Sequence, residues 1–143
     1  MPYFYLDDIA TADVAFEAWG ETKEEMFIAA AEASMNVMVE DLNTIDAYEN
    51  KRFHFASESI EMLLFDLLQE LIYFKDAEQL LIRIHKVSIL KIDGHFVLNA
   101  DAYGETIDPR KHELNADVKA VTLHRYRVEE SEKGWRASVV LDI

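Results

Sequence analysis

Several short stretches of the chain alternate apolar with polar residues, which is the pattern of a half-buried β-strand. Residues 14–19 (VAFEAW) alternate in this way, and so does the closing segment WRASVVLDI. The dipeptide Asp93-Gly94 between two longer alternating stretches predicts a hairpin turn. Strands are therefore predicted at residues 3–6, 14–19, 52–56, 80–92, 95–103 and 118–128 and in the closing segment.

Two other segments repeat their apolar residues at the spacing of an α-helix. Thr22 and Glu25 form a capping-box signature, and apolar residues follow at helical spacing as far as Met38. The small residues of AAAEAS in this segment predict a helix that lies close against a sheet. A second helix is predicted at about 59–74, where leucine and isoleucine residues form one apolar stripe.

These elements predict a single α+β domain that spans residues 1–143. A chain of 143 residues is long enough to bury a sizeable core, and it shows neither an internal repeat nor a linker. The most economical packing is one mixed, mostly antiparallel sheet of about seven strands, with the two helices on one face.

Composition narrows the class of protein. No apolar run reaches the roughly 18 residues of a membrane-spanning helix. The N-terminal MPYFYLDD lacks a signal-peptide pattern. The chain also has no cysteine. Disulfides and thiolate metal sites are thereby excluded. We expect a cytoplasmic protein that has no association with membranes.

The chain is strongly acidic, with 14 basic and 28 acidic residues and a net charge of −14. Such a charge repels the phosphates of nucleic acids, and no basic cluster reverses it locally. Direct nucleic acid binding is therefore not expected, and a role in RNA metabolism would require a protein partner. Acidity that only aids solubility would explain the same composition.

The sequence contains no P-loop, GxGxxG, GxSxG or HExxH motif. Its five histidines are scattered without metal-ligand spacing, so structural roles are expected for them. The end of the chain is more informative, because the Asp142 side chain and the terminal carboxylate of Ile143 are adjacent. Two such anions repel each other unless a cation neutralises them, and oxygen ligands suit Ca²⁺ or Mg²⁺. A solvated chain end is the alternative, and a metal would need a third ligand.

Four motifs in order along the chain resemble the archease family. They are TADVAFEAWG at 11–20, DPRKHE at 108–113, DVKAVTLH at 117–124 and the closing VVLDI. The resemblance covers nearly the whole chain, including both predicted helices and the Gly104-Glu105 pair.

The resemblance implies a sheet with two helices similar to a chaperone domain, and a role without enzymatic activity. Archeases are protein cofactors of the GTP-dependent RNA-splicing ligase that joins tRNA halves. They promote guanylylation and multiple turnover of that ligase, and they carry a divalent metal site, for which Ca²⁺ is expected here and Mg²⁺ is possible. Matched motif by motif, the metal ligands are Asp13, Asp142 and the Ile143 terminus, and the lysine that functions in ligase activation is Lys119.

The first motif departs from the family pattern. Family members commonly read Asp/Glu-His-Thr-Ala-Asp, whereas this chain reads LDDIATAD, with two extra residues and Ala10 before Thr11. The role of the histidine, such as orienting the aspartate, is absent or passes to Asp7 or Asp8.

Two other functions fit the same residues. In a small metal-dependent hydrolase, Asp13 and Asp142 would hold the ion and activate a water while Lys119 stabilises an anionic transition state. In a general chaperone, exposed apolar surface would bind many clients.

Overall fold

The computed structural model describes residues 2–6 and 13–143. Seven strands and two α-helices occur in these residues, together with a short 3₁₀ turn, η1 (Leu42–Thr44). The helices are α1 (Lys23–Met38) and α2 (Ile60–Glu78). The strands are β1 (Tyr3–Leu6), β2 (Asp13–Gly20), β3 (Glu49–Ser57), β4 (Leu80–Ile92), β5 (His95–Thr106), β6 (Ala120–Ser131) and β7 (Gly134–Asp142).

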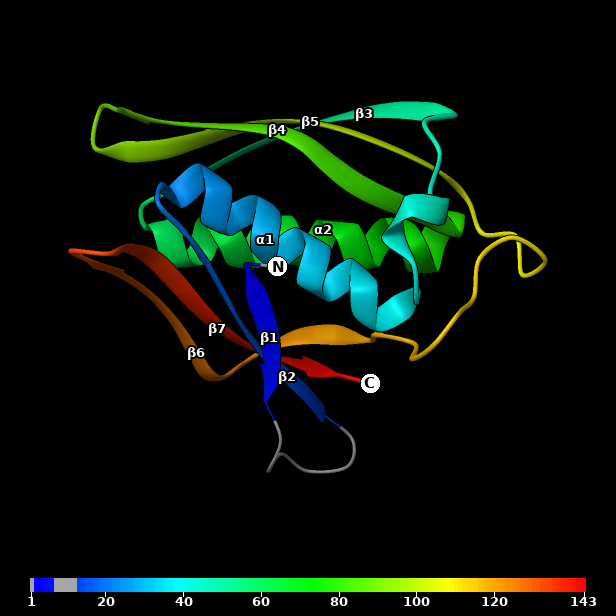
Figure 1. Cartoon of the computed structure of the whole chain (residues 1–143). Coiled ribbons are helices and arrows are strands. Elements are labelled where there is room, and N and C mark those ends of the chain that lie inside the picture. Colours follow the sequence, from blue (N-terminus) through cyan, green and yellow to red (C-terminus); the bar gives the residue numbers. More distant parts are fainter. Residues whose placement is uncertain (1, 7–12) are drawn as a thin grey trace.

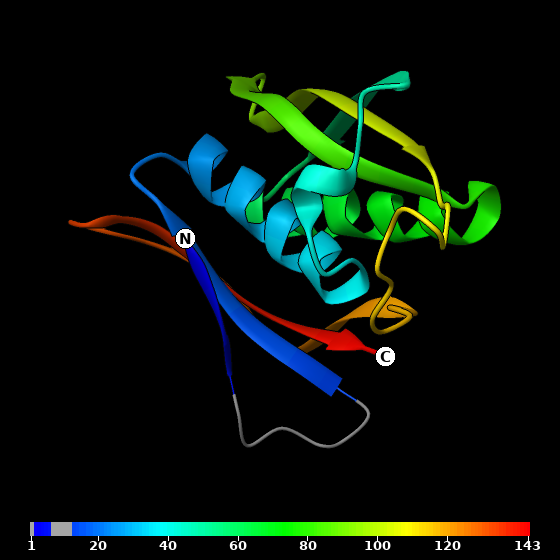
Figure 2. The ribbon, with the colours of Figure 1, turned by 45° about the vertical axis from the view of Figure 1, so that its right-hand side comes forward.

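The strands form two antiparallel sheets, and the helices lie between them (Figure 1 and Figure 2). One sheet has the order β1-β2-β7-β6 and the other the order β3-β5-β4. The α+β class, the two helices and the seven strands are confirmed. The prediction of a single sheet with both helices on one face was wrong, because the helices separate two sheets.

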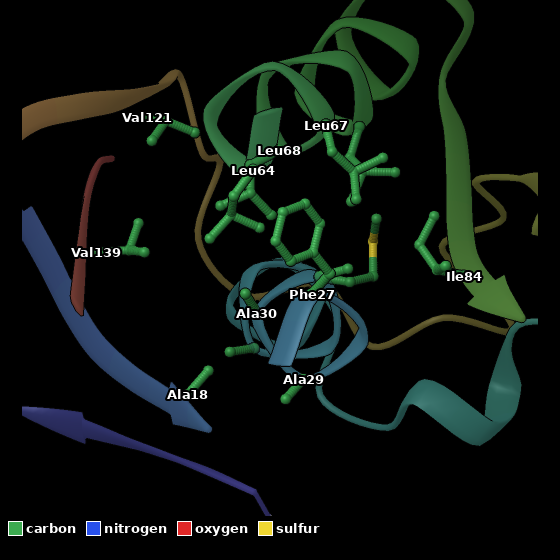
Figure 3. Packing of buried hydrophobic residues seen from close by; sticks show 14 of the residues in the cluster. Ala18, Phe27, Ala29, Ala30, Leu64, Leu67, Leu68, Ile84, Val121 and Val139 are labelled. Carbon is green, nitrogen blue, oxygen red and sulfur yellow. The ribbon is translucent and has the colours of Figure 1, made fainter. Parts of the chain in front are cut away.

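The apolar surface of α1 explains this layering. Ten of its residues are buried, and they lie on nearly every side of the helix between Met26 and Met38. A helix that is apolar all round must be covered on all sides. In Figure 3, Phe27 of α1 lies beside Leu64 and Leu68 of α2, with Val139 on one side of the core and Ile84 on the other.

Local signals set the helix boundaries as expected. The hydroxyl of Thr22 accepts a hydrogen bond from the backbone N–H of Glu25 at 3.1 Å, and Ser59 caps α2 in the same way. Helix α2 extends four residues beyond the predicted end at 74. It stops at Gln79, whose left-handed backbone (φ = 54°) closes the last turn.

Strand β6 contains an irregularity that bears on the surface of its sheet. Thr122 pairs with Val140 and Arg127 pairs with Ser138, so residues 123–126 lie opposite a single residue of β7. This β-bulge breaks the regular ladder at the outer edge of the four-stranded sheet.

No helix in the described part of the chain is long and apolar enough to cross a membrane.

Candidate functional site

Asp13 and Asp142 lie directly opposite each other on neighbouring strands. The antiparallel register of β2 and β7 pairs Asp13 with Asp142, and Asp142 also pairs with Ala120 at the start of β6. Residues paired in this way have Cβ atoms about 4.5–5.5 Å apart, with side chains on the same face. The register therefore brings together two carboxylates from opposite ends of the chain.

The two aspartates face away from the helices. Their strand neighbours Val14 and Leu141 pack into the core, and successive residues of a strand point to opposite faces. Both aspartates are partly exposed. Like charges directly opposite each other destabilise a sheet, so this position favours a bound cation.

Ile143 and Lys119 lie beside this pair. The side chain of Ile143 is partly buried against the core, which fixes the main chain next to Asp142. The backbone N–H of Lys119 donates to the backbone oxygen of Asp142 at 2.8 Å, and the Lys119 side chain is exposed. Asp13, Asp142, Ile143 and the backbone of Lys119 thus meet at one place, which we call the terminal corner.

The terminal corner has the donor chemistry for a hard cation. Asp13 and Asp142 supply carboxylate oxygens, the ligands that Ca²⁺ and Mg²⁺ prefer. Within residues 2–6 and 13–143, no three His, Asp or Glu side chains converge as a metal site. Among these described residues, the third ligand expected from the family pattern is therefore a main-chain group, the carboxylate of Ile143.

A buried polar network fixes the loop that leads towards Lys119. His112 is buried, and its Nε2 lies 2.6 Å from Oε1 of Glu105, while its Nδ1 accepts a hydrogen bond from the N–H of Asp108 at 3.0 Å. This pattern assigns the ring proton to Nε2, which donates to Glu105. Lys111 Nζ binds the same Glu105 oxygen and Oδ2 of Asp46, each at 2.6 Å.

The same contacts set the pKa of Glu105. Burial alone would raise the pKa of this carboxyl group, but hydrogen bonds from Lys111 and His112 outweigh burial and hold it below its ordinary value of 4.5. Glu105 is therefore a stable anion in the interior, and it anchors the loop to the end of β5.

Lys75 of α2 fixes the other end of this loop. Its buried ammonium group pairs with Asp117 and with Asp76, and it donates to the backbone oxygen of Val118 at 2.8 Å. Burial would lower the pKa of Lys75, yet the hydrogen bonds that it donates to Asp117 and Asp76 raise the pKa above its ordinary value of 10.5. The chain is thus held immediately before Lys119.

Sequence reasoning missed the roles of Glu105 and Lys75. The available signal for Glu105 and His112 is that both belong to stretches that carry the family resemblance. The signal for Lys75 is weaker: it is a charged residue within an apolar helical segment. Asp7, Asp8 and Thr11, which concern the missing histidine, lie outside the described residues.

The fold and the terminal corner define a small α+β protein whose acidic groups gather where β2 and β7 meet the start of β6. The model of the Archease protein family (MTH1598/TM1083) matches residues 3–143, and the chain belongs to this family. The resemblance drawn from the four motifs is confirmed.

Relatives and solved structures agree with this assignment. Protein archease of Pyrococcus abyssi is 38% identical over 134 residues, covering 93% of this chain and 94% of that protein. Protein archease of Methanosarcina barkeri is 35% identical over 142 residues, covering 99% and 95%. The solution structure of Methanobacterium thermoautotrophicum protein 1598 has a TM-score of 0.85 at 36% identity, covering 99% of both chains. The crystal structure of a Thermotoga maritima archease, described as a possible chaperone, shares the fold, with a TM-score of 0.57, 23% identity and coverage of 93% and 92%.

Proposed function

We propose that this protein is a metal-binding activator of a GTP-dependent RNA-splicing ligase, which promotes guanylylation and multiple turnover of that ligase in tRNA splicing. Membership of the archease family supports the role, since the resemblance implies this partner. The observation that carries the proposal is the pairing of Asp13 with Asp142 on the outer face of the sheet. The protein acts in the cytoplasm as a protein cofactor, with no catalysis of its own and no direct contact with nucleic acid.

In this proposal the carboxylates of Asp13, Asp142 and the Ile143 terminus hold the ion, Ca²⁺ or Mg²⁺. When bound, the ion supplies positive charge that can attract phosphate oxygens at the active site of the ligase. The exposed ammonium group of Lys119 adds a second positive charge at the edge of the terminal corner, within reach of the same partner.

The direct test combines the protein with purified ligase, GTP and Ca²⁺ or Mg²⁺ and follows guanylylation of the ligase over many turnovers. Guanylylation should continue beyond the first turnover only when the protein is present. An unchanged course would contradict the proposal. Turnover of phosphate esters by the isolated protein would instead support the metal-dependent hydrolase.

A general chaperone is the second candidate. The T. maritima neighbour is described as a possible chaperone, and Phe4 and Leu6 of β1 are 41% and 38% exposed. This function predicts that the protein suppresses aggregation of unrelated clients in the absence of ligase.

Replacement of Lys119 by alanine should separate metal binding from ligase activation. A protonated lysine cannot be a ligand, and removal of its charge favours a nearby cation by about 1 kcal/mol at 4 Å in water-like screening. Lys119→Ala should therefore bind metal as well as the unmodified protein or better, yet activate the ligase poorly. Lys133→Ala, at an exposed position between β6 and β7, is the matched control. A folded, metal-bound Lys119→Ala protein with full activation would exclude the role of this lysine.

A short extension after Ile143 should weaken metal binding. It converts the terminal carboxylate into an amide and moves the new terminus away from Asp142, so we expect a loss of about tenfold or more in affinity. Ile143→Val keeps the carboxylate and is the control. Calorimetry that gives equal Ca²⁺ affinity for the extended and control proteins would remove this group from the site.

A further inference from the structure

A second feature of the outer face of the four-stranded sheet is a hollow of about 350 Å³. Leu6, Ala15 and Val140 are among its apolar lining residues, and its charged lining residues are Arg125 and Arg127. No carboxylate side chain of the described residues lines it, although the net charge of the chain is −14. By contrast, another hollow, of about 990 Å³, is lined by one arginine and by five acidic residues: Glu21, Glu25, Glu32, Glu40 and Asp41. Among the described residues, the smaller hollow is therefore lined by two arginines and by no acidic side chain.

This hollow lies next to the terminal corner. Ala15 pairs with Val140, as Asp13 pairs with Asp142, and the two pairs are separated by two residues along each strand. Residues two apart in a strand share a face and are about 6.6–6.8 Å apart. The floor of the hollow and the carboxylate pair are thus neighbouring positions on one surface.

The β-bulge of β6 brings Arg125 to this hollow. Arg125 has a left-handed backbone with φ = 54°, a conformation that is costly for a residue with a Cβ atom. Bulges of this kind redirect side chains, and they are frequent beside functional sites. Arg127 pairs with Glu129 at 3.1 Å but remains 70% exposed, and none of the ion pairs among residues 2–6 and 13–143 includes Arg125.

We propose that this hollow binds the phosphates of a polyphosphate-bearing ligand, and that the same ligand contacts the metal ion held at the terminal corner. Arginine binds phosphate oxygens through two parallel hydrogen bonds, and a neighbouring cation adds to the attraction. The inference rests on the proposed metal site and extends it. It assigns the surface beside that site to a phosphate ligand, which the metal ion and the two arginines bind together.

The test is a titration of the ¹⁵N-labelled full-length protein, followed by NMR, at a constant excess of Mg²⁺. One arm uses inorganic tripolyphosphate and the other uses GTP. Both should shift the amide signals of Ala15, Val140 and the bulge. Equal affinities identify the phosphates as the whole recognised group, whereas tighter binding of GTP identifies a nucleotide as the source of the phosphates.

The double substitution Arg125→Gln and Arg127→Gln should weaken tripolyphosphate binding by about tenfold or more, the loss typical of hydrogen bonds between charged groups. The control Arg52→Gln with Arg110→Gln removes the same charge from two exposed arginines elsewhere, with side chains 90% and 94% exposed, and should change the affinity little. A melting curve checks that each variant is folded.

Equal losses in both double variants, shifts confined to other surfaces, or no binding at millimolar concentration would overturn the inference. A separate calorimetric titration with metal alone distinguishes the two proposals. If metal binds at the terminal corner but tripolyphosphate does not bind, only this inference fails. If metal does not bind, the proposed metal-dependent function fails.

Discussion

Replacement of Asp142 by alanine is expected to abolish metal binding and ligase activation together while the fold is retained. The change removes one of the two paired carboxylates but keeps the backbone oxygen that accepts the hydrogen bond from Lys119. Even changes to groups that only orient metal ligands cost about 10–100-fold in affinity. Loss of a ligand itself should therefore exceed about 100-fold, as measured by calorimetry with Ca²⁺ and Mg²⁺.

The matched control is Glu132→Ala, which removes one exposed negative charge from the turn between β6 and β7, at a distance from the pair. It should bind metal and activate the ligase normally. In metal-free buffer, Asp142→Ala should melt at the same temperature as the unmodified protein or higher, because repulsion between Asp13 and Asp142 is removed. Unchanged metal affinity in a folded Asp142→Ala protein would show that the pair is not the site.

The second large effect is expected from Glu105→Ala, which should lower the free energy of unfolding by about 3 kcal/mol. The substitution leaves the buried Nε2–H of His112 without its acceptor and deprives Lys111 of one of its two carboxylates. Chemical denaturation measures this loss. Asp108→Ala, which removes an exposed carboxylate from the same loop, is the control and should cost less than half as much.

Glu105 should also make stability depend on acid pH. Its pKa is held below the ordinary value of 4.5 in the folded protein, so its stabilising contribution is present above pH 4.5 and is lost as the pH falls through the lower, folded-state value. Glu105→Gln keeps an oxygen that accepts from His112 but does not titrate, and its stability should fall less below pH 4.5. Identical acid profiles for the two proteins would exclude Glu105 as the source.

The sequence was most informative where the determinants of structure are local. Alternation located the strands, and the hydroxyl groups of Thr22 and Ser59 mark the starts of the helices because each caps the next turn of its own chain. The arrangement of the layers depends on contacts between distant segments. A period of 3.6 residues identifies a helix, but it does not say how many sheets will cover it.

The terminal corner illustrates the same limit. No spacing rule joins Asp13 to Asp142, since their meeting depends on the register of two strands from opposite ends of the chain. They were paired through the family resemblance alone. Lys75 was missed because its partners, Asp117 and the oxygen of Val118, come from a loop 42 and 43 residues further along the chain.

The strand order has a consequence for biosynthesis. Strand β7 lies between β2 and β6 in its sheet, yet it is the last strand to leave the ribosome. The β1–β2 hairpin can form early, but its sheet lacks the strand between β2 and β6 until residues 134–142 have been synthesised. A chain interrupted before that point would lack half of the aspartate pair as well as the strand that joins the two sides of the sheet.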